Sequence, residues 1–258
     1  MIGRLANSSN KSNMLTRKRH VLFICVVVIP ALFILGCESE RIKSPKYYFP
    51  FPENTDGYVY QFVSMDGQQP DEFWHISRVG ERKMRICVMD EFRGWRQCSY
   101  EYIASNGIIQ EELWILDDSL GQLDVEVLHG NLYPLDPIDK THVYIQSLRW
   151  YTSRDSSTYM QVIRNRRFTP QSTKSTDLGD RFVLFEVMEI VEDFQEGYLE
   201  IPVQGLEVFE KGRGLVHYEK EFGGQFGHQF TFEEKLTVSE FEELTGAGVL
   251  SPGSRPAD

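Results

Sequence analysis

The chain has 258 residues, of which 41% are hydrophobic and 13% aromatic, a composition typical of a folded protein and not of a disordered one. It carries 27 basic and 38 acidic side chains, which gives a net charge of −11 at pH 7. This acidic balance excludes nucleic acid as an expected partner, because binding to a polyanion through counterion release needs a basic surface.

The first 36 residues have the three parts of a secretory leader. Arg17–His20 form a basic region, Val21–Leu35 form an apolar segment without a charged residue, and Gly36 is the small residue before a cleavage point. The apolar segment is shorter than the ~20 residues that a membrane-spanning helix needs, so we predict a cleaved signal peptide over 1–36. A start at Met14 would give the leader a more usual basic region.

The leader ends in Ile34-Leu35-Gly36-Cys37, which resembles the lipobox of bacterial lipoproteins, usually Leu-(Ala/Ser/Thr)-(Gly/Ala)-Cys. The resemblance implies cleavage between Gly36 and Cys37, followed by a diacylglyceryl thioether and an N-acyl chain on Cys37. Two or three acyl chains make a stable membrane anchor, whereas one gives only marginal binding. Glu38 stands where the family's inner-membrane retention signal places Asp, so the resemblance favours the outer membrane of a Gram-negative cell envelope.

Removal of the leader changes the charge of the mature chain. It takes away five basic side chains and no acidic one, which leaves 22 basic and 38 acidic side chains and a net charge of −16. Such a domain is not expected to lie flat on anionic lipid. We predict a lipidated tether over 37–47, a single β domain over 48–245 and a flexible tail over 246–258. The predicted partners are the membrane, reached through the anchor, and a lipid or protein of the envelope; no cofactor is predicted.

About a dozen short runs of aromatic and β-branched residues follow the tether, separated by turn signals such as Asp66-Gly67 and Asn106-Gly107. The expected strands are Tyr58–Ser64, Phe73–Val79, Lys83–Asp90, Trp95–Ala104, Ile108–Leu116, Leu123–Leu128, His142–Tyr151, Thr158–Phe168, Phe182–Val191, Gly197–Phe209, Leu215–Phe222 and Phe230–Val238. No long helical pattern separates them, so they predict an all-β fold, a single antiparallel meander. So many strands must curl into a barrel, a half-barrel or a sandwich.

Two late segments give more detail. The run Phe230–Val238 alternates most clearly, which predicts one buried face that carries Phe230, Phe232, Leu236 and Val238. The run Phe182–Val191 is apolar on both faces and is expected in the centre of the sheet. Ser239-Glu240-Phe241-Glu242 predicts a capping box that opens a short C-terminal helix, which ends at Gly246.

Cys87 and Cys98 are the two cysteines that remain if Cys25 leaves with the leader and Cys37 is lipidated. They flank Glu91–Gly94, a candidate hairpin turn. A two-residue loop would place them directly opposite, where an oxidising periplasm would let them form a disulfide; a three-residue loop would make them diagonal and strain the bond. The alternative is a pair of half-buried thiols. Without a His at ligand spacing, no metal site is predicted.

Two further motifs bracket the predicted β domain. They are Tyr48-Phe49-Pro50-Phe51-Pro52 with Gly57-Tyr58-Val59-Tyr60, and Glu210-Lys211-Gly212-Arg213-Gly214-Leu215-Val216 with Tyr218. They resemble the opening and closing segments of a loose group of secreted bacterial β-sheet proteins, many of them lipoproteins. The sheets of that group are similar to the open half-barrel of the lipoprotein carrier and its outer-membrane receptor, which hold acyl chains. This chain lacks the helices that plug that half-barrel, so the resemblance does not imply acyl-chain transport.

Arg164 and Arg166 are the leading candidates for a binding site, because both stand on the apolar stripe of the strand Thr158–Phe168. Glu186 and Glu234 interrupt apolar faces in the same way. An inward charge needs a partner, since an unpaired buried charge is very costly. We favour a set of structural ion pairs. The alternative is a guanidinium pair that orients an anionic headgroup or carboxylate at the mouth of an apolar cavity.

The sequence carries no recognisable catalytic motif, and no catalytic residue is predicted. We expect a non-enzymatic binding or scaffold lipoprotein of the cell envelope that holds an apolar or anionic ligand in a β cavity. The alternatives are an envelope-assembly accessory that acts through its surface or a sheet edge, and a hydrolase with a site built from dispersed residues. A large internal pocket would favour the first, an exposed edge strand the second, and a cleft with perturbed carboxylate groups the third.

Overall fold

The computed structural model describes residues 50–90, 94–105, 107–134, 143–153, 155–169, 182–194, 198–224 and 226–249. All of them lie in one compact unit, Ser44–Asp258. The predicted signal peptide (1–36), Cys37, the tether (37–47) and the last nine residues of the predicted tail fall outside the described residues. Within the described part of the chain, no helix is long and apolar enough to cross a membrane.

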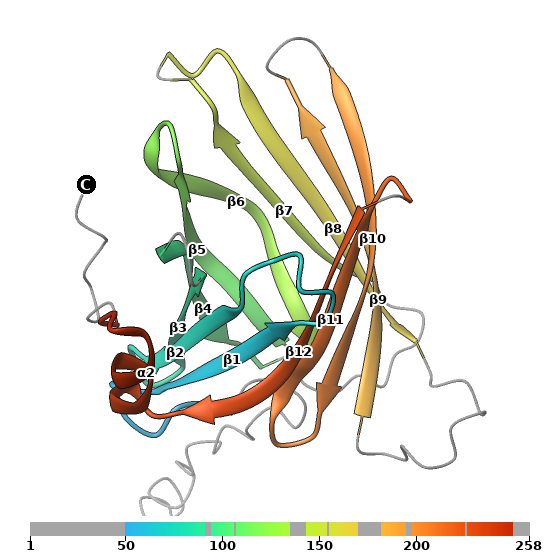
Figure 1. Cartoon of the computed structure of the whole chain (residues 1–258). Helices are drawn as coiled ribbons and strands as arrows, with labels where there is room; N and C mark the ends of the chain where they lie inside the picture. The colour runs from blue at the N-terminus through green and yellow to red at the C-terminus, as the bar shows by residue number, and fades with distance from the viewer. Residues whose placement is uncertain are drawn as a thin grey trace, which may run out of the picture. The chain divides into compact units, whose positions relative to one another are not determined.

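Twelve antiparallel strands form one closed barrel, in which each strand pairs with its sequence neighbours and β1 closes against β12 (Figure 1). The strands are β1 (Tyr58–Ser64), β2 (Glu72–Arg78), β3 (Lys83–Asp90), β4 (Gly94–Ile103), β5 (Gly107–Asp117), β6 (Gly121–Pro134), β7 (Val143–Tyr151), β8 (Tyr159–Thr169), β9 (Phe182–Asp193), β10 (Leu199–Glu210), β11 (Gly214–Phe222) and β12 (Phe226–Leu236). The predicted antiparallel meander is confirmed, and of the three expected architectures it is the barrel. Closure pairs every described strand on both sides, so β9 is no more central than the others.

A bulge in β12 changes which side chains point into the barrel. Glu233 is an extra residue opposite the β1 pair Gln61–Phe62, since Gln61 pairs with Glu234 and Phe62 with Phe232. Side chains alternate along a strand, so the two faces are exchanged at the bulge. Phe232 contacts the interior cluster, whereas Leu236 packs on the outside of the barrel. The prediction that both residues share one face is therefore wrong.

The helix α2 (Val238–Thr245) is capped by Thr237, two residues before the predicted cap Ser239. The hydroxyl of Thr237 accepts a hydrogen bond from the Glu240 backbone at 3.2 Å, and the Glu240 carboxylate accepts one from the Thr237 backbone at 2.7 Å. This reciprocal pair is the capping box, displaced from the predicted position. Gly246 ends the helix in the left-handed conformation, at the expected residue.

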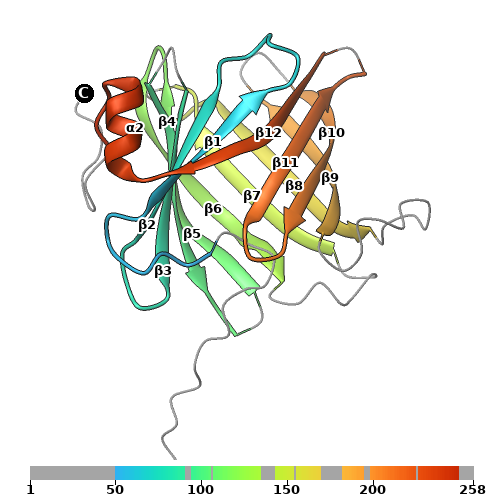
Figure 2. The ribbon, with the colours of Figure 1, turned by 60° about the horizontal axis from the view of Figure 1, so that its bottom comes forward.

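Helix α2 lies outside the barrel, beside the strands that begin and end the sheet (Figure 2). Its buried residue, Phe241, packs with Val59 and Leu236 from the outer face of β1 and β12. Ala247 and Val249 pack against the same cluster, so the predicted tail begins within packed structure. The helix therefore covers one outer face of the barrel and does not enter its interior.

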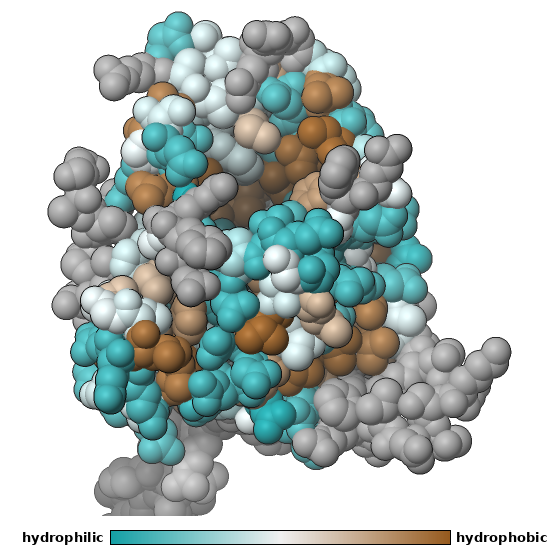
Figure 3. Space-filling view, in the orientation of Figure 1, coloured by the Kyte–Doolittle hydropathy of each residue, from teal (hydrophilic) through white to brown (hydrophobic). Residues whose placement is uncertain are grey.

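Alternate turns of a closed meander gather at opposite ends of the barrel. The interior is filled at one of these ends and hollow at the other. The aromatic end carries the β2–β3 and β10–β11 turns, and its interior is filled. The buried residues there are Tyr58, Tyr60, Phe62, Ile76, Met84, Ile86, Ile108, Leu132, Phe185, Phe209, Leu215 and Phe230. Each such side chain contributes about 2 kcal/mol on burial. At the opposite, open end, the space-filling surface is hollowed and apolar side chains are visible inside the hollow (Figure 3).

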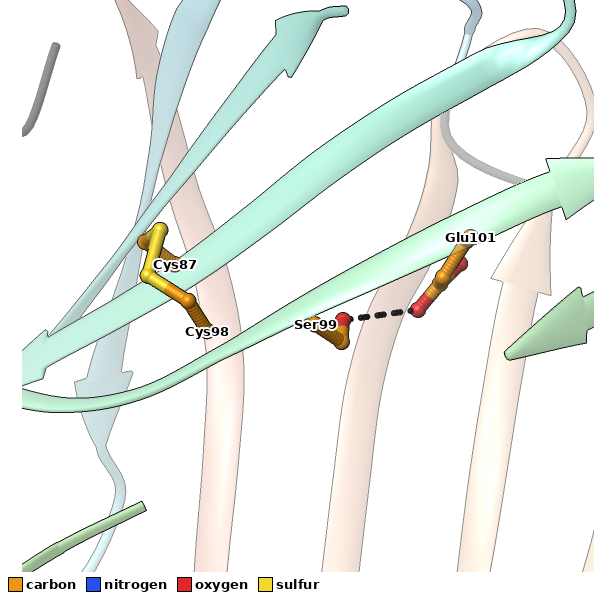
Figure 4. Close-up of a disulfide and its surroundings, with 4 residues drawn as sticks. All are labelled: Cys87, Cys98, Ser99 and Glu101. Carbon is orange, nitrogen blue, oxygen red and sulfur yellow. Dashed lines mark hydrogen bonds between the residues drawn. A yellow bond between two sulfur atoms is a disulfide. The ribbon is translucent and has the colours of Figure 1, made fainter. Parts of the chain in front are cut away.

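Cys87 on β3 lies directly opposite Cys98 on β4, and the two form a disulfide with Cα atoms 4.0 Å apart (Figure 4). Three residues separate the paired Asp90 and Gly94, the loop length expected to make the two cysteines diagonal. The register is restored by a bulge at Arg96, because Val88 pairs with Gln97 while the next residue of β3 pairs with Trp95. A three-residue loop is thus compatible with a directly opposed pair.

Candidate functional site

A cavity of about 440 Å³ occupies the barrel between the aromatic end and the open end. Its lining runs from Gln69 and Pro70 in the β1–β2 turn down to Phe209 and Leu215 of the aromatic cluster. This volume falls in the lower part of the range of small-molecule sites, roughly 300–1,000 Å³. The interior is therefore large enough to hold a ligand of that kind.

One wall of the cavity is apolar. Leu113 of β5 and Leu148 of β7 line it. They belong to a cluster with Val125, Val127, Ile115, Trp150, Val162 and Val191. Val162 lies two residues from Arg164 on β8 and therefore shares its inward face. We call the Leu113 and Leu148 side of the cavity the apolar wall; it lies between the open end and a layer of charged side chains.

Arg166 is a buried, paired charge in that layer. Its guanidinium donates to both carboxylate oxygens of Glu207, at 2.9 and 3.2 Å, and only 3% of the residue is exposed. The Tyr133 hydroxyl donates to the same carboxylate at 2.9 Å, and its ring centroid lies 4.6 Å from the guanidinium carbon. Burial acts to raise the pKa of Glu207, but Arg166 outweighs it and the pKa is lowered. Arg166 is thus fully engaged in an interior ion pair with Glu207.

Arg164 and Lys220 share a single carboxylate. Arg164 Nε donates to Glu189 Oε2 at 2.5 Å, and Lys220 Nζ lies 3.6 Å from the same oxygen. Burial acts to raise the pKa of Glu189, but the two cations outweigh it and lower this pKa to about 2. Burial and repulsion by Arg164 lower the pKa of Lys220, and Glu189 offsets only part of that effect. Two cations around one anion leave a local surplus of positive charge.

Gln146 joins the two groups of ion pairs. Its side-chain oxygen accepts from Arg164 at 3.0 Å and from Arg166 at 3.3 Å, and its amide donates to the side chain of Gln110. Gln146 and Gln110 are both buried. Gln146 thus holds the side chains of Arg164 and Arg166 in place, and the charged layer forms a fixed floor below the apolar wall.

Glu101 on β4 is a further buried carboxyl group that lines the cavity. The Ser99 hydroxyl donates to it at 3.2 Å (Figure 4). Burial raises the pKa of Glu101 to about 7, against the opposing effects of Ser99 and of Arg166. Near neutral pH this group is therefore close to half protonated.

Of the four predicted ligand-binding residues, the structure brings Arg164 and Arg166 together on the cavity wall and places Glu186 and Glu234 elsewhere. Glu186 on β9 and Glu234 on β12 are exposed on the outside of the barrel. The prediction that they face inward is wrong. The bulge at Glu233 turns Glu234 outward, and the inward carboxylate of β9 is Glu189, three residues beyond Glu186.

Sequence reasoning missed Glu189, Glu207, Lys220 and Glu101. The signal for Lys220 was present, since it stands between Tyr218 and Phe222 on one face of a strand, as Arg164 does on β8. For Glu189 no such signal existed. Both faces of β9 are apolar and each carries a Glu, so only its pairing with β8 decides which one points inward.

Within the described part of the chain, no group of three His, Cys, Asp or Glu side chains is placed to hold a metal ion. No family of known proteins, no curated protein and no solved structure matches the chain. The class of molecule is therefore defined by its own fold and site: a closed, twelve-stranded antiparallel β-barrel with a cavity that is apolar on one wall and charged at its floor.

Proposed function

We propose that this chain is a lipoprotein anchored to the outer membrane of a bacterial cell envelope, whose barrel binds an amphipathic ligand without catalysis. The anchor is supported by the leader over 1–36 and by the lipobox that ends at Cys37. Binding is supported by one observation above all, the cavity of about 440 Å³ with its apolar wall and charged floor.

The energetics favour a ligand with an apolar chain. Each methylene group that leaves water for the apolar wall of Leu113 and Leu148 contributes about 0.8 kcal/mol to binding. A charged floor next to an apolar wall suits a molecule with a polar head and an apolar tail. An anchored barrel would also stay close to the membrane, where such molecules are found.

Binding is tested with a neutral apolar fluorophore, N-phenyl-1-naphthylamine, added to the delipidated protein. Leu148→Trp on β7 places an indole in the cavity, and we expect it to weaken binding at least tenfold. Ile145→Trp on the same strand is the matched control, because Ile145 is 44% exposed on the outer face. Circular dichroism checks the fold. Unchanged binding by a folded Leu148→Trp protein would contradict the proposal.

Anchoring is tested separately by metabolic labelling with palmitate. We expect the full chain to incorporate the label and Cys37→Ser to lose both the label and the membrane association. A wild-type chain that takes up no label would refute the anchor without bearing on the cavity.

A second candidate function, a hydrolase, is favoured by the raised pKa of Glu101 in the cavity. A carboxyl group with a pKa near 7 suits general acid or base catalysis at neutral pH. Turnover of p-nitrophenyl acyl esters by the wild type, abolished in Glu101→Gln, would support it. A wild-type rate equal to the uncatalysed rate would remove it. The accessory function through a sheet edge has no free edge among the described strands, since each is paired on both sides.

A further inference from the structure

We propose that the ligand is a single-chain amphiphile with one carboxylate, whose head binds between Lys220 and Arg164 and whose chain follows the apolar wall toward the open end. This inference rests on the proposed binding function and specifies the chemistry of its ligand. It assigns the head-group contacts to Lys220 and Arg164, and not to the pair of arginines that the sequence suggests.

Lys220 and Arg164 are more exposed to the cavity than Arg166 is. Lys220, like Tyr218 and Phe222 on the same face of β11, lines the cavity, as do Arg164 and Arg166. The exposed fraction of the side chain is 32% for Lys220 and 19% for Arg164, but only 4% for Arg166. The two cations that share Glu189 can therefore be reached by a ligand in the cavity, whereas Glu207 and Tyr133 enclose Arg166.

Lys220 has hydrogen-bond donors that no described residue engages. The ammonium group of Lys220 has three donors. Its nearest carboxylate oxygen, Glu189 Oε2, is 3.6 Å away, beyond hydrogen-bond distance, and that oxygen already accepts from Arg164 at 2.5 Å. Among the described residues, no acceptor lies within hydrogen-bond distance of Lys220 Nζ. A ligand carboxylate would supply the missing acceptors and would balance the surplus positive charge.

Three other charged residues on the cavity wall, Glu72, Asp90 and Arg96, already have hydrogen-bond or ionic partners. Glu72 Oε2 accepts from Trp74 at 2.8 Å and from Tyr218 at 2.5 Å. Asp90 pairs with Arg96 at 2.6 Å. A ligand anion would therefore gain the most binding free energy from contacts with Lys220 and Arg164.

The local charge also indicates how many negative charges the ligand's head group carries. Arg164 and Lys220 around Glu189 leave one surplus positive charge, which matches one carboxylate and is too small for a dianionic phosphate. The volume of about 440 Å³ lies near the lower limit for small-molecule sites, which favours one chain over two.

The test compares three probes with the same chain length but different heads, titrated into the delipidated full chain at pH 7: hexadecanoate, hexadecan-1-ol and hexadecylamine. We expect hexadecanoate to bind at least tenfold more tightly than the alcohol, and the amine more weakly than both. Lys220→Met should reduce hexadecanoate binding to the level of the alcohol and leave alcohol binding within twofold. Lys211→Met, the same change of charge at an exposed position in the β10–β11 turn, should keep the preference.

The outcomes separate the two proposals. If none of the probes binds, the proposed binding function fails. If wild type binds acid and alcohol equally, or the amine most tightly, binding stands and the carboxylate inference is overturned. If Lys220→Met does not fold, the carbon-13 signal of carboxyl-labelled hexadecanoate bound to the wild type decides. A bound head that titrates below its ordinary pKa supports the inference, and one that titrates at or above it overturns the inference.

Discussion

Glu101 is the residue whose ionisation should be visible in the stability of the fold. Burial raises its pKa to about 7 from 4.5, so the folded state holds the proton more tightly than the unfolded chain does. The contribution of this group to stability therefore falls as the pH rises from about 4.5 to about 7. We expect Glu101→Gln to match the wild type near pH 4 and to exceed it by roughly 3 kcal/mol above pH 7. Urea unfolding across this range measures the difference.

The comparison must be between the two proteins, because another buried group acts in the opposite direction. Burial lowers the pKa of His75, so its contribution to stability rises with pH over part of the same range. His75 is unchanged in the variant and cancels in the difference. Parallel curves for Glu101→Gln and wild type would mean that the buried carboxyl group is not held protonated.

The residues of the site were predictable only where the local pattern is asymmetric. Arg164 and Arg166 stand out because the rest of their face on β8 is apolar, and both line the cavity. Glu186 was misassigned because the two faces of β9 are alike, and Glu234 because a bulge has no signature in the alternation itself. Which of two arginines a ligand can reach depends on partners that come from other strands, and a single strand does not specify them.

At the scale of single elements, the residue that caps helix α2 differs from the one predicted from the sequence. Thr237 makes the reciprocal hydrogen bonds of the capping box, and Ser239 lies inside the first turn. We expect Thr237→Ala to lower the free energy of unfolding by about 1 kcal/mol. Ser239→Ala should change it by less than half of that. The reverse order in chemical denaturation would restore the cap predicted from the sequence.

A second prediction at this scale concerns the β3–β4 hairpin. The disulfide between Cys87 and Cys98 closes a loop with a sequence separation of 11 residues. A cross-link of this span should stabilise the fold by about 2–3 kcal/mol. We expect dithiothreitol to lower the wild-type unfolding midpoint, and to leave unchanged that of a Cys87→Ala, Cys98→Ala double variant. A wild-type midpoint that does not respond to the reductant would show that the bond contributes nothing.

Strand positions followed closely from local sequence. Tyr58–Ser64 and Lys83–Asp90 agree residue for residue with β1 and β3, since turn residues bound both runs clearly. β6 continues to Pro134, well beyond the predicted end at Leu128, because its pairing shifts register and breaks the alternation there. The sequence could not distinguish the barrel from the half-barrel. Closure depends on pairing between β1 and β12, which are the first and last strands in the sequence.

At the scale of the whole molecule, one end of the barrel holds the packed core and the rest of the interior holds the proposed binding site. The aromatic cluster fills one end, so the fold does not depend on a ligand to complete its core. The charged floor lies above that cluster, and the apolar wall leads from it toward the open end. Among the described residues, the sheet is closed and α2 lies outside it, so no described helix enters the interior, unlike a half-barrel plugged by helices.

Native mass spectrometry of the full chain, purified from bacterial membranes in mild detergent, tests the central claim most directly. We expect the wild type to carry one noncovalent molecule with the mass of a long-chain carboxylic acid. Leu148→Trp should lose this adduct, and Ile145→Trp, altered on the outer face of the same strand, should keep it. A folded wild-type protein that retains no adduct and yields no lipid on extraction would contradict the account.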